Sequence, residues 1–462
     1  MKIVCPIHRW AREAPARIAV QSGSRVMDYA TLDEHIEALS QQLLVKGLTP
    51  GQRLTVTARG SLDALLLAWA CLRAGIVFCP LDPALPMVLQ ASLTARLEAA
   101  AFCPLESTSG LPENVTILLL DTRQRARVEQ DVLLDTEQFS NTIFTSGSSG
   151  APKAVLHRLG NHLASAQGAA TLMPLDADSA WLLSLPLFHV GGYAIPFRVF
   201  RAGARVVLDN RHSALAMRLE RLPITHLSLV PTQLWRLLEA GFDPSTTRLR
   251  ELLLGGAPIP APLVARMTAL GLPPKVSYGL SEMASQVCTG APTRSGEVGK
   301  PLPGREVRLV AGEIQVRGET LFAGYLTPTG VDSARNTSGW FATRDRGELT
   351  DEGALIVHGR MDNAFISGGE NIQPEAIEQR LVDHPGVAQA LVVPVEHPEW
   401  GQRPVAFIDW RKAPIPNCQL AAWVREALPA YMTPDAWLSW PRQAVGLKPS
   451  RQRFAEIAAA QV

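Results

Sequence analysis

The segment 142–153, which reads TIFTSGSSGAPK, joins a run typical of a β-strand to a turn of hydroxyl residues and glycines that ends in a lysine. Glycines let backbone N–H groups converge on an anion, Ser and Thr hydroxyls donate further hydrogen bonds, and lysine adds a positive charge. The segment therefore suits a nucleotide polyphosphate. The residues with this predicted role are Thr145, Ser146, Gly147, Ser148, Ser149, Gly150 and Lys153.

This turn differs from a Walker A loop, in which Gly directly precedes the Lys and Ser or Thr directly follows it. Here Pro152 precedes Lys153 and Ala154 follows it. A flexible surface loop is the alternative interpretation, because Ser-Gly repeats alone are typical of linkers. The Pro-Lys ending and the motifs described below argue against that alternative.

Around this segment, predicted helices alternate with short β-branched strands. A predicted helix at 62–74 is followed by a strand at 76–80, and 115–120 predicts another strand. Such alternation is typical of a mostly parallel sheet with both faces covered. Further predicted strands are 206–208, 226–230, 252–254 and 275–278, and further predicted helices are 231–240 and 260–270.

The pattern changes twice toward the C-terminus. Past Gly296, short strands with glycine-rich turns predict a small β subdomain. From Asp362, a helix at 374–382, a strand at 387–394 and a Trp-rich tail predict a third unit. We therefore expect an α/β protein with parallel-sheet α/β subdomains and the β subdomain in residues 1–361. A small, mobile α+β domain would follow in residues 362–462, with the hinge near Asp362.

Composition excludes several classes of protein. The 462-residue chain is 47% apolar and 19% charged, which excludes collagen, coiled coil and disorder. With 44 basic and 43 acidic residues the net charge is +1, so we expect no nucleic-acid partner. The six cysteines include no C-x-x-C pair, which argues against zinc ribbons and disulfide scaffolds. The sequence leaves the oligomeric state open, a homo-oligomer included.

The sequence predicts neither a membrane span nor a secretory signal. The longest apolar stretch, 62–81, contains Asp63 and Arg73, and a charge at the centre of a membrane span is costly. Residues 1–10 lack the unbroken apolar core of a secretory signal. We therefore expect a cytoplasmic protein that does not insert into a membrane.

Six motifs in a fixed order carry a resemblance to the adenylate-forming superfamily, which includes acyl-CoA synthetases, luciferases and peptide-synthetase adenylation domains. An ordered set is far more specific than any single motif, and the resemblance runs from about Tyr29 to Arg453. Besides 142–153, the motifs are 183–192 (LSLPLFHVGG), 254–257 (LGGA), 278–282 (YGLSE), 343–349 (TRDRGEL) and 359–362 (GRMD).

The resemblance implies a nucleotide site. Gly255, Gly256 and Ala257 would approach the adenine, and Tyr278 beside Gly279 would offer a flat face for stacking. Glu282 would be an oxygen ligand of the Mg²⁺ that accompanies ATP.

The same resemblance implies that Asp345 accepts hydrogen bonds from the ribose hydroxyls and that Arg360 donates to ribose or phosphate. Read without the resemblance, Asp345 between Arg344 and Arg346 would form ordinary surface ion pairs. The sequence alone favours that second reading.

Lys448 lies in segment 446–451 (GLKPSR), where the family carries its adenylation lysine. A cation at this place would stabilise the charge that accumulates around the α-phosphate in the transition state. Taken alone, a lysine in a tail is usually solvated, and Lys412 beside Arg411 is expected to be so. Segment 443–445 (QAV) departs from the family pattern before the glycine but leaves the lysine in place.

The resemblance also implies a reaction in two steps. A carboxylate attacks the α-phosphorus of ATP to give an acyl-adenylate and pyrophosphate, and the thiol of coenzyme A then displaces AMP. A hinge near Asp362 would let the domain that carries Lys448 rotate away between the steps. Segment 368–371 (GGEN) matches the family's loop that approaches the thiol site, and it also fits a turn before the helix at Pro374.

Arg198 bears on which acid is used. It follows the predicted acyl-pocket loop among apolar residues, where an unpaired charge is costly, so it invites a second carboxylate on the substrate. From spacing alone, pairing with a protein carboxylate or capping a helix explains Arg198 at least as well.

Segments 181–190, 229–238 and 301–307 are similar to the 2-succinylbenzoate–CoA ligases of menaquinone biosynthesis. This resemblance implies that Arg198 lies by a carboxylate of that acid, with Gly191 and Ser281 at the positions of two assisting hydroxyl residues. Gly191 lacks the hydroxyl, and a water would take its place.

His189 would lie at the pocket wall, where it gates the acyl site or contacts the substrate, and a structural histidine fits equally well. Lys448, Glu282 and His189 are the candidate catalytic residues. The expected substrates are 2-succinylbenzoate, ATP and coenzyme A, with Mg²⁺. The alternatives are a ligase for another aryl or acyl acid and a catalytically silent nucleotide-binding protein.

Overall fold

The computed structural model describes residues 1–57, 60–105, 115–145, 152–208, 213–292, 296–411, 413–441 and 450–462. Its N-terminal part contains two large mixed sheets, each of which includes a run of neighbouring parallel strands, as predicted. The first has the order β20-β19-β9-β8-β5-β4-β6. Its strands are β4 (Arg53–Thr57), β5 (Val77–Leu81), β6 (Ala101–Pro104), β8 (Phe139–Thr145), β9 (Lys153–Arg158), β19 (Gly324–Thr327) and β20 (Gly330–Asp332).

The second sheet has the order β16-β15-β14-β13-β12-β10-β11-β2-β3, with antiparallel strands at both edges. Its strands are β2 (Ile18–Ser22), β3 (Arg25–Asp28), β10 (Ala180–Leu183), β11 (Arg205–Leu208), β12 (His226–Leu229), β13 (Glu251–Gly255), β14 (Lys275–Leu280), β15 (Ser285–Gly290) and β16 (Lys300–Pro301). A separate pair joins β1 (Lys2–Val4) to β7 (Leu133–Asp135).

Helices cover these sheets and fill the space between them. α5 packs on β9, α6 packs on β10 and β11, and α5 and α6 contact each other. The N-terminal helices are α1 (Pro6–Glu13), α2 (Tyr29–Val45), α3 (Leu62–Ala74), α4 (Met87–Arg96), α5 (Leu159–Ala169), α6 (Val190–Ala202), α7 (Leu215–Arg221), α8 (Pro231–Glu239) and α9 (Ala261–Ala269). Among the described residues, no helix has the length and apolar character needed to cross a membrane.

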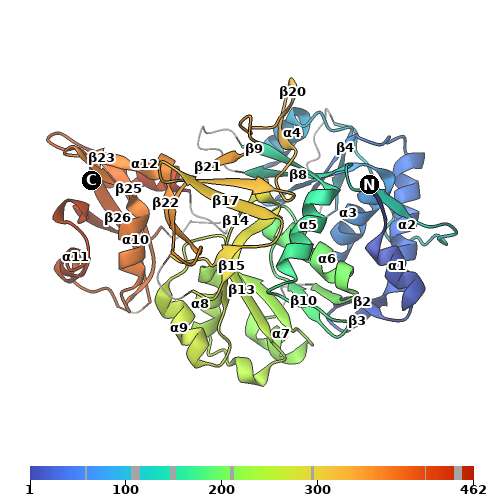
Figure 1. Ribbon diagram of the computed structural model, residues 1–462, viewed down its shortest axis with the longest axis horizontal. Helices are drawn as coiled ribbons and strands as arrows, with labels where there is room; N and C mark the ends of the chain where they lie inside the picture. Colours follow the sequence, from blue (N-terminus) through green and yellow to red (C-terminus); the bar gives the residue numbers. More distant parts are fainter. Residues whose placement is uncertain are drawn as a thin grey trace.

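A small β subdomain and a C-terminal α+β unit complete the chain. The subdomain is a four-stranded sheet of β17 (Arg305–Val310), β18 (Glu313–Gly318), β21 (Phe341–Leu349) and β22 (Leu355–Arg360). Figure 1 shows the C-terminal elements grouped at one side of the molecule, beyond β22. They are β23 (Phe365–Ser367), β24 (Glu370–Ile372), α10 (Pro374–Val382), β25 (Val387–His397), β26 (Gly401–Trp410), α11 (Asn417–Arg425), β27 (Ala436–Ser439) and α12 (Arg451–Gln461).

Two expectations show what local sequence could and could not fix. The predicted helix 62–74 is confirmed residue for residue as α3, which begins after the capping residue Ser61 and ends at Gly75 with φ of 71°. The predicted strand at 115–120 is wrong. The main chain of that segment pairs with β6 only around Phe102, where it makes a single bridge from Ile117.

The α3 cap gives a stability prediction. The Ser61 hydroxyl accepts a hydrogen bond of 3.2 Å from the Ala64 amide at the start of a helix that is almost wholly buried. We expect Ser61→Ala to lower the free energy of unfolding by about 1 kcal/mol, because the amide loses its acceptor. Urea denaturation followed by circular dichroism measures the change. Ser61→Asp, which can still cap, is the control and should unfold near the wild-type midpoint.

Candidate active site

The predicted phosphate turn joins two antiparallel strands. Thr145 at the end of β8 pairs with Lys153 at the start of β9. A strand–turn–strand arrangement differs from the strand–loop–helix of Walker A proteins, which confirms that distinction. Thr145 and Lys153 are placed at the two ends of the turn. The predicted residues Ser146, Gly147, Ser148, Ser149 and Gly150 lie outside the described residues.

Lys153 and Glu282 meet through an aromatic residue that sequence reasoning missed. The Lys153 Nζ lies 4.8 Å from the centroid of the Tyr325 ring, and the Tyr325 hydroxyl donates a 2.7 Å hydrogen bond to Glu282 Oε1. β19 brings Tyr325 there by pairing with β9. Burial, and then the nearby Glu282 carboxylate, raise the pKa of Tyr325, so its hydroxyl remains a donor. No local pattern marks Tyr325, because its partner Glu282 is 43 residues away in the chain.

The glycine-rich residues gather at the carboxyl ends of two neighbouring parallel strands. Gly255 ends β13 and lies opposite Ser277 of β14, one residue before Tyr278. Gly256 has a φ of 82°, and both it and Ala257 are exposed. Gly279 sits where a Cβ atom would lie 2.2 Å from the Ser285 carbonyl oxygen, so only glycine fits. This edge of a parallel sheet is where such folds form ligand crevices.

Tyr278, Asp345 and Arg360 form one hydrogen-bonded group. The Tyr278 hydroxyl donates to Asp345 Oδ2 at 2.5 Å, and Arg360 Nη1 donates to Asp345 Oδ1 at 3.1 Å across the β21–β22 pair. Burial, and then the Asp345 carboxylate, raise the pKa of Tyr278. Three predicted nucleotide residues from distant motifs are therefore brought together.

The surface ion-pair reading of Asp345 is wrong. Side chains alternate along β21, which turns Asp345 inward at 8% exposure while Arg344 and Arg346 point outward. Arg344 instead pairs at 2.7 Å with Asp362, the predicted hinge residue, in a short turn after β22. The predicted role of Asp362 as a hinge stays a prediction.

Arg198 is a buried cation inside α6. Its side chain is 4% exposed, and its Nη2 donates a 3.2 Å hydrogen bond to Ser285 Oγ. Its guanidinium carbon also lies 5.4 Å from the centroid of the Trp181 ring. Within the described part of the chain, its Nε has no partner and no carboxylate lies within ion-pair distance.

Two alternatives for Arg198 can now be compared with the structure. Helix capping is wrong, because Arg198 lies within α6. Pairing with a protein carboxylate finds no candidate among the described residues. Burial, and then the neighbouring Arg305, lower the pKa of Arg198 to about 9, so it keeps its charge at neutral pH. A buried cation without a counter-ion suits an anionic ligand.

The remaining predicted acyl-site residues surround the start of α6 and the turn before β15. His189 is the exposed residue before α6, and its ring lies 4.7 Å from that of Phe188. A Cβ atom on Gly191 would lie 3.2 Å from Leu185 Cδ1, and, apart from the adjoining chain, this side-chain atom is its one neighbour within 4 Å among the described residues. Ser281 begins a short 3₁₀ turn. Lys448 and segment 442–449 lie outside the described residues.

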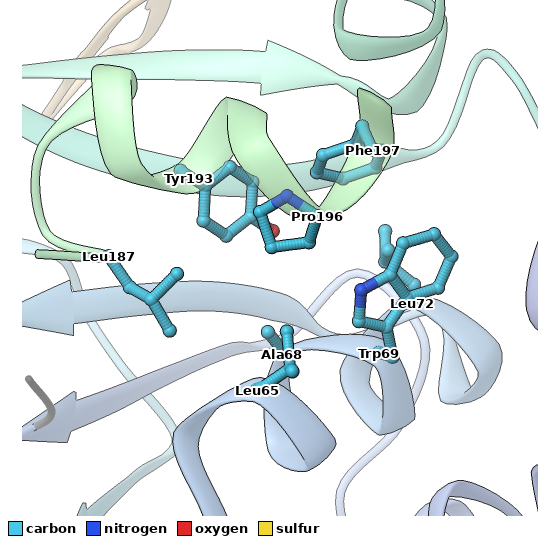
Figure 2. A pocket seen from close by; sticks show the side chains of 8 residues that line it. All are labelled: Leu65, Ala68, Trp69, Leu72, Leu187, Tyr193, Pro196 and Phe197. Atoms are coloured by element: carbon cyan, nitrogen blue, oxygen red, sulfur yellow. The ribbon is translucent and has the colours of Figure 1, made fainter. Parts of the chain in front are cut away.

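A separate small cavity of about 10 Å³, room for about one water molecule, lies between α3 and α6. Figure 2 shows Tyr193, Pro196 and Phe197 of α6 facing Leu65, Ala68, Trp69 and Leu72 of α3, with Leu187 beside them. Its lining carries no charged side chain, and Arg198 is not among the lining residues. This cavity is a feature of core packing rather than the predicted acid site.

Comparisons with known proteins agree with this geometry. Residues 7–326 match the family model of the AMP-binding enzymes, and residues 376–442 match that of the AMP-binding enzyme C-terminal domain. The chain is 38% identical to 2-succinylbenzoate–CoA ligase of Salmonella typhimurium over 98% of this chain and 97% of that protein.

Solved structures give the same answer. A variant of Escherichia coli MenE with bound OSB-AMS has a TM-score of 0.90 and 35% identity, with 99% of each chain covered. MenE of Bacillus subtilis in complex with ATP and magnesium has a TM-score of 0.88 and 27% identity, covering 99% of this chain and all of that one. The α/β fold and the adenylate-forming family predicted from the motifs are confirmed. The chain belongs to the AMP-binding enzyme family and is an AMP-forming acid–thiol ligase of that family.

Proposed function

We propose that this ligase joins 2-succinylbenzoate to coenzyme A through a bound acyl-adenylate and releases AMP and pyrophosphate, a step of menaquinone biosynthesis. The observation that carries the choice of acid is Arg198, a buried cation whose partner within the described chain is the neutral Ser285 hydroxyl. 2-Succinylbenzoate has two carboxylates, so one can be activated while Arg198 holds the other. Ligases for fatty acids or benzoate would bury this charge for no gain.

The ATP site follows from the groups described above. We propose that adenine stacks on Tyr278 beside Gly255, Gly256 and Ala257, since these residues share one sheet edge. Asp345 would accept hydrogen bonds from the ribose hydroxyls. Arg360 Nη1 holds that carboxylate in place by donating a 3.1 Å hydrogen bond to Asp345 Oδ1. Thr145, Lys153 and the turn between them would grip the phosphates.

The magnesium ion that this reaction requires fits Glu282. Within the described chain, the hydrogen-bond partner of the Glu282 carboxylate is the Tyr325 hydroxyl on Oε1, and Tyr325 fixes its direction. Mg²⁺ is usually held by one or two carboxylates together with substrate phosphates, so a single carboxylate next to the phosphate turn is a suitable donor set. When bound, the ion would neutralise phosphate charge.

The order of events follows from what each residue can do. Arg198 and the Ser281 region would orient the acid so that its other carboxylate, which is already ionised, faces the α-phosphorus. Lys448 would then stabilise the charge of the transition state. His189 is exposed at the pocket wall and is proposed to gate the acid site rather than to move a proton. Rotation about Asp362 would admit coenzyme A for the second step.

We further propose that the partners are these small molecules and that the enzyme works in the cytoplasm. The support for the location is that all six cysteines are free thiols, five of them buried, as is usual in a reducing compartment.

The role of Arg198 predicts a result that depends on the substrate. We expect Arg198→Ala to lower kcat/KM for 2-succinylbenzoate by about 10- to 150-fold, the loss of a charged hydrogen bond worth about 1.5 to 3 kcal/mol. Two monoacids, 4-oxo-4-phenylbutanoate and 2-butyrylbenzoate, each keep one of the two carboxylates. For the monoacid that is still activated, the substitution should change kcat/KM little.

The matched control is Arg201→Ala, which removes an exposed arginine from the same helix. Release of AMP, with the thioester identified by mass, measures every case. An equal loss on the diacid and on the monoacid would contradict the carboxylate-binding role. Equal turnover of benzoate or a fatty acid by the unmodified enzyme would contradict the proposed substrate.

Tyr325→Phe tests how Glu282 is oriented. The substitution keeps the ring near Lys153 but removes the hydroxyl that donates to Glu282. We expect the Mg²⁺ concentration for half-maximal ATP–pyrophosphate exchange to rise about fivefold, because one hydrogen bond of about 1 kcal/mol no longer holds the carboxylate. Tyr431→Phe is the control. An unchanged Mg²⁺ dependence would show that Tyr325 does not orient the metal ligand.

Lys448→Ala separates the two half-reactions. We expect adenylate formation to fall by orders of magnitude, while thioester formation from supplied adenylate is spared, because the lysine stabilises only the first transition state. Lys412→Ala is the control, because the sequence predicts that this lysine of the same predicted domain is solvated. Equal losses in the rates of adenylate formation and of thioester formation would contradict a role for Lys448 in the first step alone.

A further inference from the structure

The turn that carries Ser281 and Glu282 has an unusual backbone. It runs from the 3₁₀ turn Ser281–Met283 into β15, and Ala284 and Ser285 have φ angles of 49° and 111° although neither is glycine. Residues in such conformations are strained and persist only where the surrounding structure holds them. Strained residues of this kind cluster at active sites and ligand-binding segments.

Three carbonyl groups of this turn accept hydrogen bonds from other parts of the chain. His157 Nε2 lies 2.7 Å from the Ser281 oxygen, the Phe322 amide donates to the Glu282 oxygen at 2.8 Å, and the Ser165 hydroxyl donates to the Ala284 oxygen at 2.7 Å. A carbonyl can only accept, so His157 carries its proton on Nε2. The turn is therefore held from β9, from α5 and from the segment before β19.

His157 is suited to be a fixed, neutral donor. Its ring is completely buried, and burial lowers its pKa to about 4, so it carries no charge at neutral pH. It lies on the same face of β9 as Lys153, four residues earlier, because side chains alternate along a strand. The strand β9 thus supplies both Lys153, which is proposed to bind phosphate, and His157, which holds the turn that carries Ser281 and Glu282.

Ser165 is held in turn by a second buried group. Arg305 is 6% exposed, and its Nη2 donates to the Ser165 carbonyl oxygen at 3.2 Å and lies 3.4 Å from the Ser165 hydroxyl. Its Nε donates to the Gln286 carbonyl oxygen at 2.9 Å, in the strand that follows the turn. The supports of the turn are therefore tied to one another.

We propose that His157 and Ser165 are positioning residues of the ligase reaction, which hold the strained turn 281–285 so that Ser281 and Glu282 face the acid and the phosphates. This proposal rests on the proposed function for the roles of Ser281 and Glu282. Neither positioning residue touches a substrate. Each acts through the backbone carbonyl that it binds.

His162 supplies a matched comparison within the same cluster. It is also buried, its ring lies 4.8 Å from that of His157, and its Nε2 lies 2.7 Å from Asn141 Oδ1 rather than from the turn. A general loss of core packing should therefore affect variants at both positions. A positioning role should affect variants at His157 alone.

The test compares His157→Leu, His157→Gln and His162→Leu in the full-length enzyme. ATP–pyrophosphate exchange gives kcat, the KM for the acid and for ATP, and the Mg²⁺ dependence, while thermal unfolding gives Tm. We expect His157→Leu to lower kcat by about tenfold or more and to raise the Mg²⁺ requirement, with a smaller change in the KM for ATP. His157→Gln, whose amide can still donate, should recover most of kcat.

The control outcome is equally specific. His162→Leu should lower Tm about as much as His157→Leu while kcat stays within about threefold of the unmodified enzyme. Ser165→Ala is the second variant and should act in the same direction as His157→Leu. Equal kinetic losses at His157 and His162, or a His157→Gln variant as slow as His157→Leu, would overturn the proposal.

This outcome can be separated from a failure of the proposed function. The unmodified enzyme is assayed first across the acid panel. If it turns over some other acid, the proposed substrate is wrong, and the variants are then compared on the acid that is used. If it turns over 2-succinylbenzoate but His157→Leu matches it, the positioning role alone is wrong.

Discussion

The hydrogen bonds to the carbonyls of Ser281, Glu282 and Ala284 are the constraint that fixes the backbone of the turn 281–285, on which the proposed active site depends. They come from β9, from α5 and from the segment that leads into β19, which belong to different parts of the chain. A turn with two strained residues keeps its shape only if its surroundings hold it. The two large sheets therefore have to be assembled before the Glu282 carboxylate, the proposed metal ligand, takes its position.

The contact between the two large sheets also explains how a triphosphate can be bound without the helix of a Walker A motif. The phosphate turn lies between two antiparallel strands, and the strand next to them, β19, places an aromatic ring near the lysine. The hydroxyl on that ring reaches Glu282 in the turn that joins β14 and β15 of the other sheet. Lys153 and Glu282, the residues proposed for the phosphates and the metal, are thus connected through the Tyr325 side chain.

Buried positive charge is the second theme of the site. Arg198 and Arg305 both lie in the interior, where burial lowers the pKa of Arg198 to about 9 and that of Arg305 to about 10. Arg305 is satisfied by backbone carbonyls, whereas Arg198 has a hydroxyl and an aromatic face. That difference separates an arginine that supports the fold from one that can receive a substrate carboxylate.

The sequence by itself determined the elements and motifs whose signals are local. Ser61 and Gly75 mark the ends of α3, and Pro374 begins α10 as predicted. The ordered motifs identified the family, because each motif is a contiguous segment, and they predict its nucleotide residues. Only the tertiary structure decided that Asp345 faces inward to Tyr278 and Arg360 and that residues 115–120 form no strand. It also decided that Tyr325, His157, Ser165 and Arg305 contact segment 281–286. The physical reason is that these contacts join residues far apart in the chain: His157 and Ser281, for example, are separated by 124 positions, and no local pattern records which strands become neighbours.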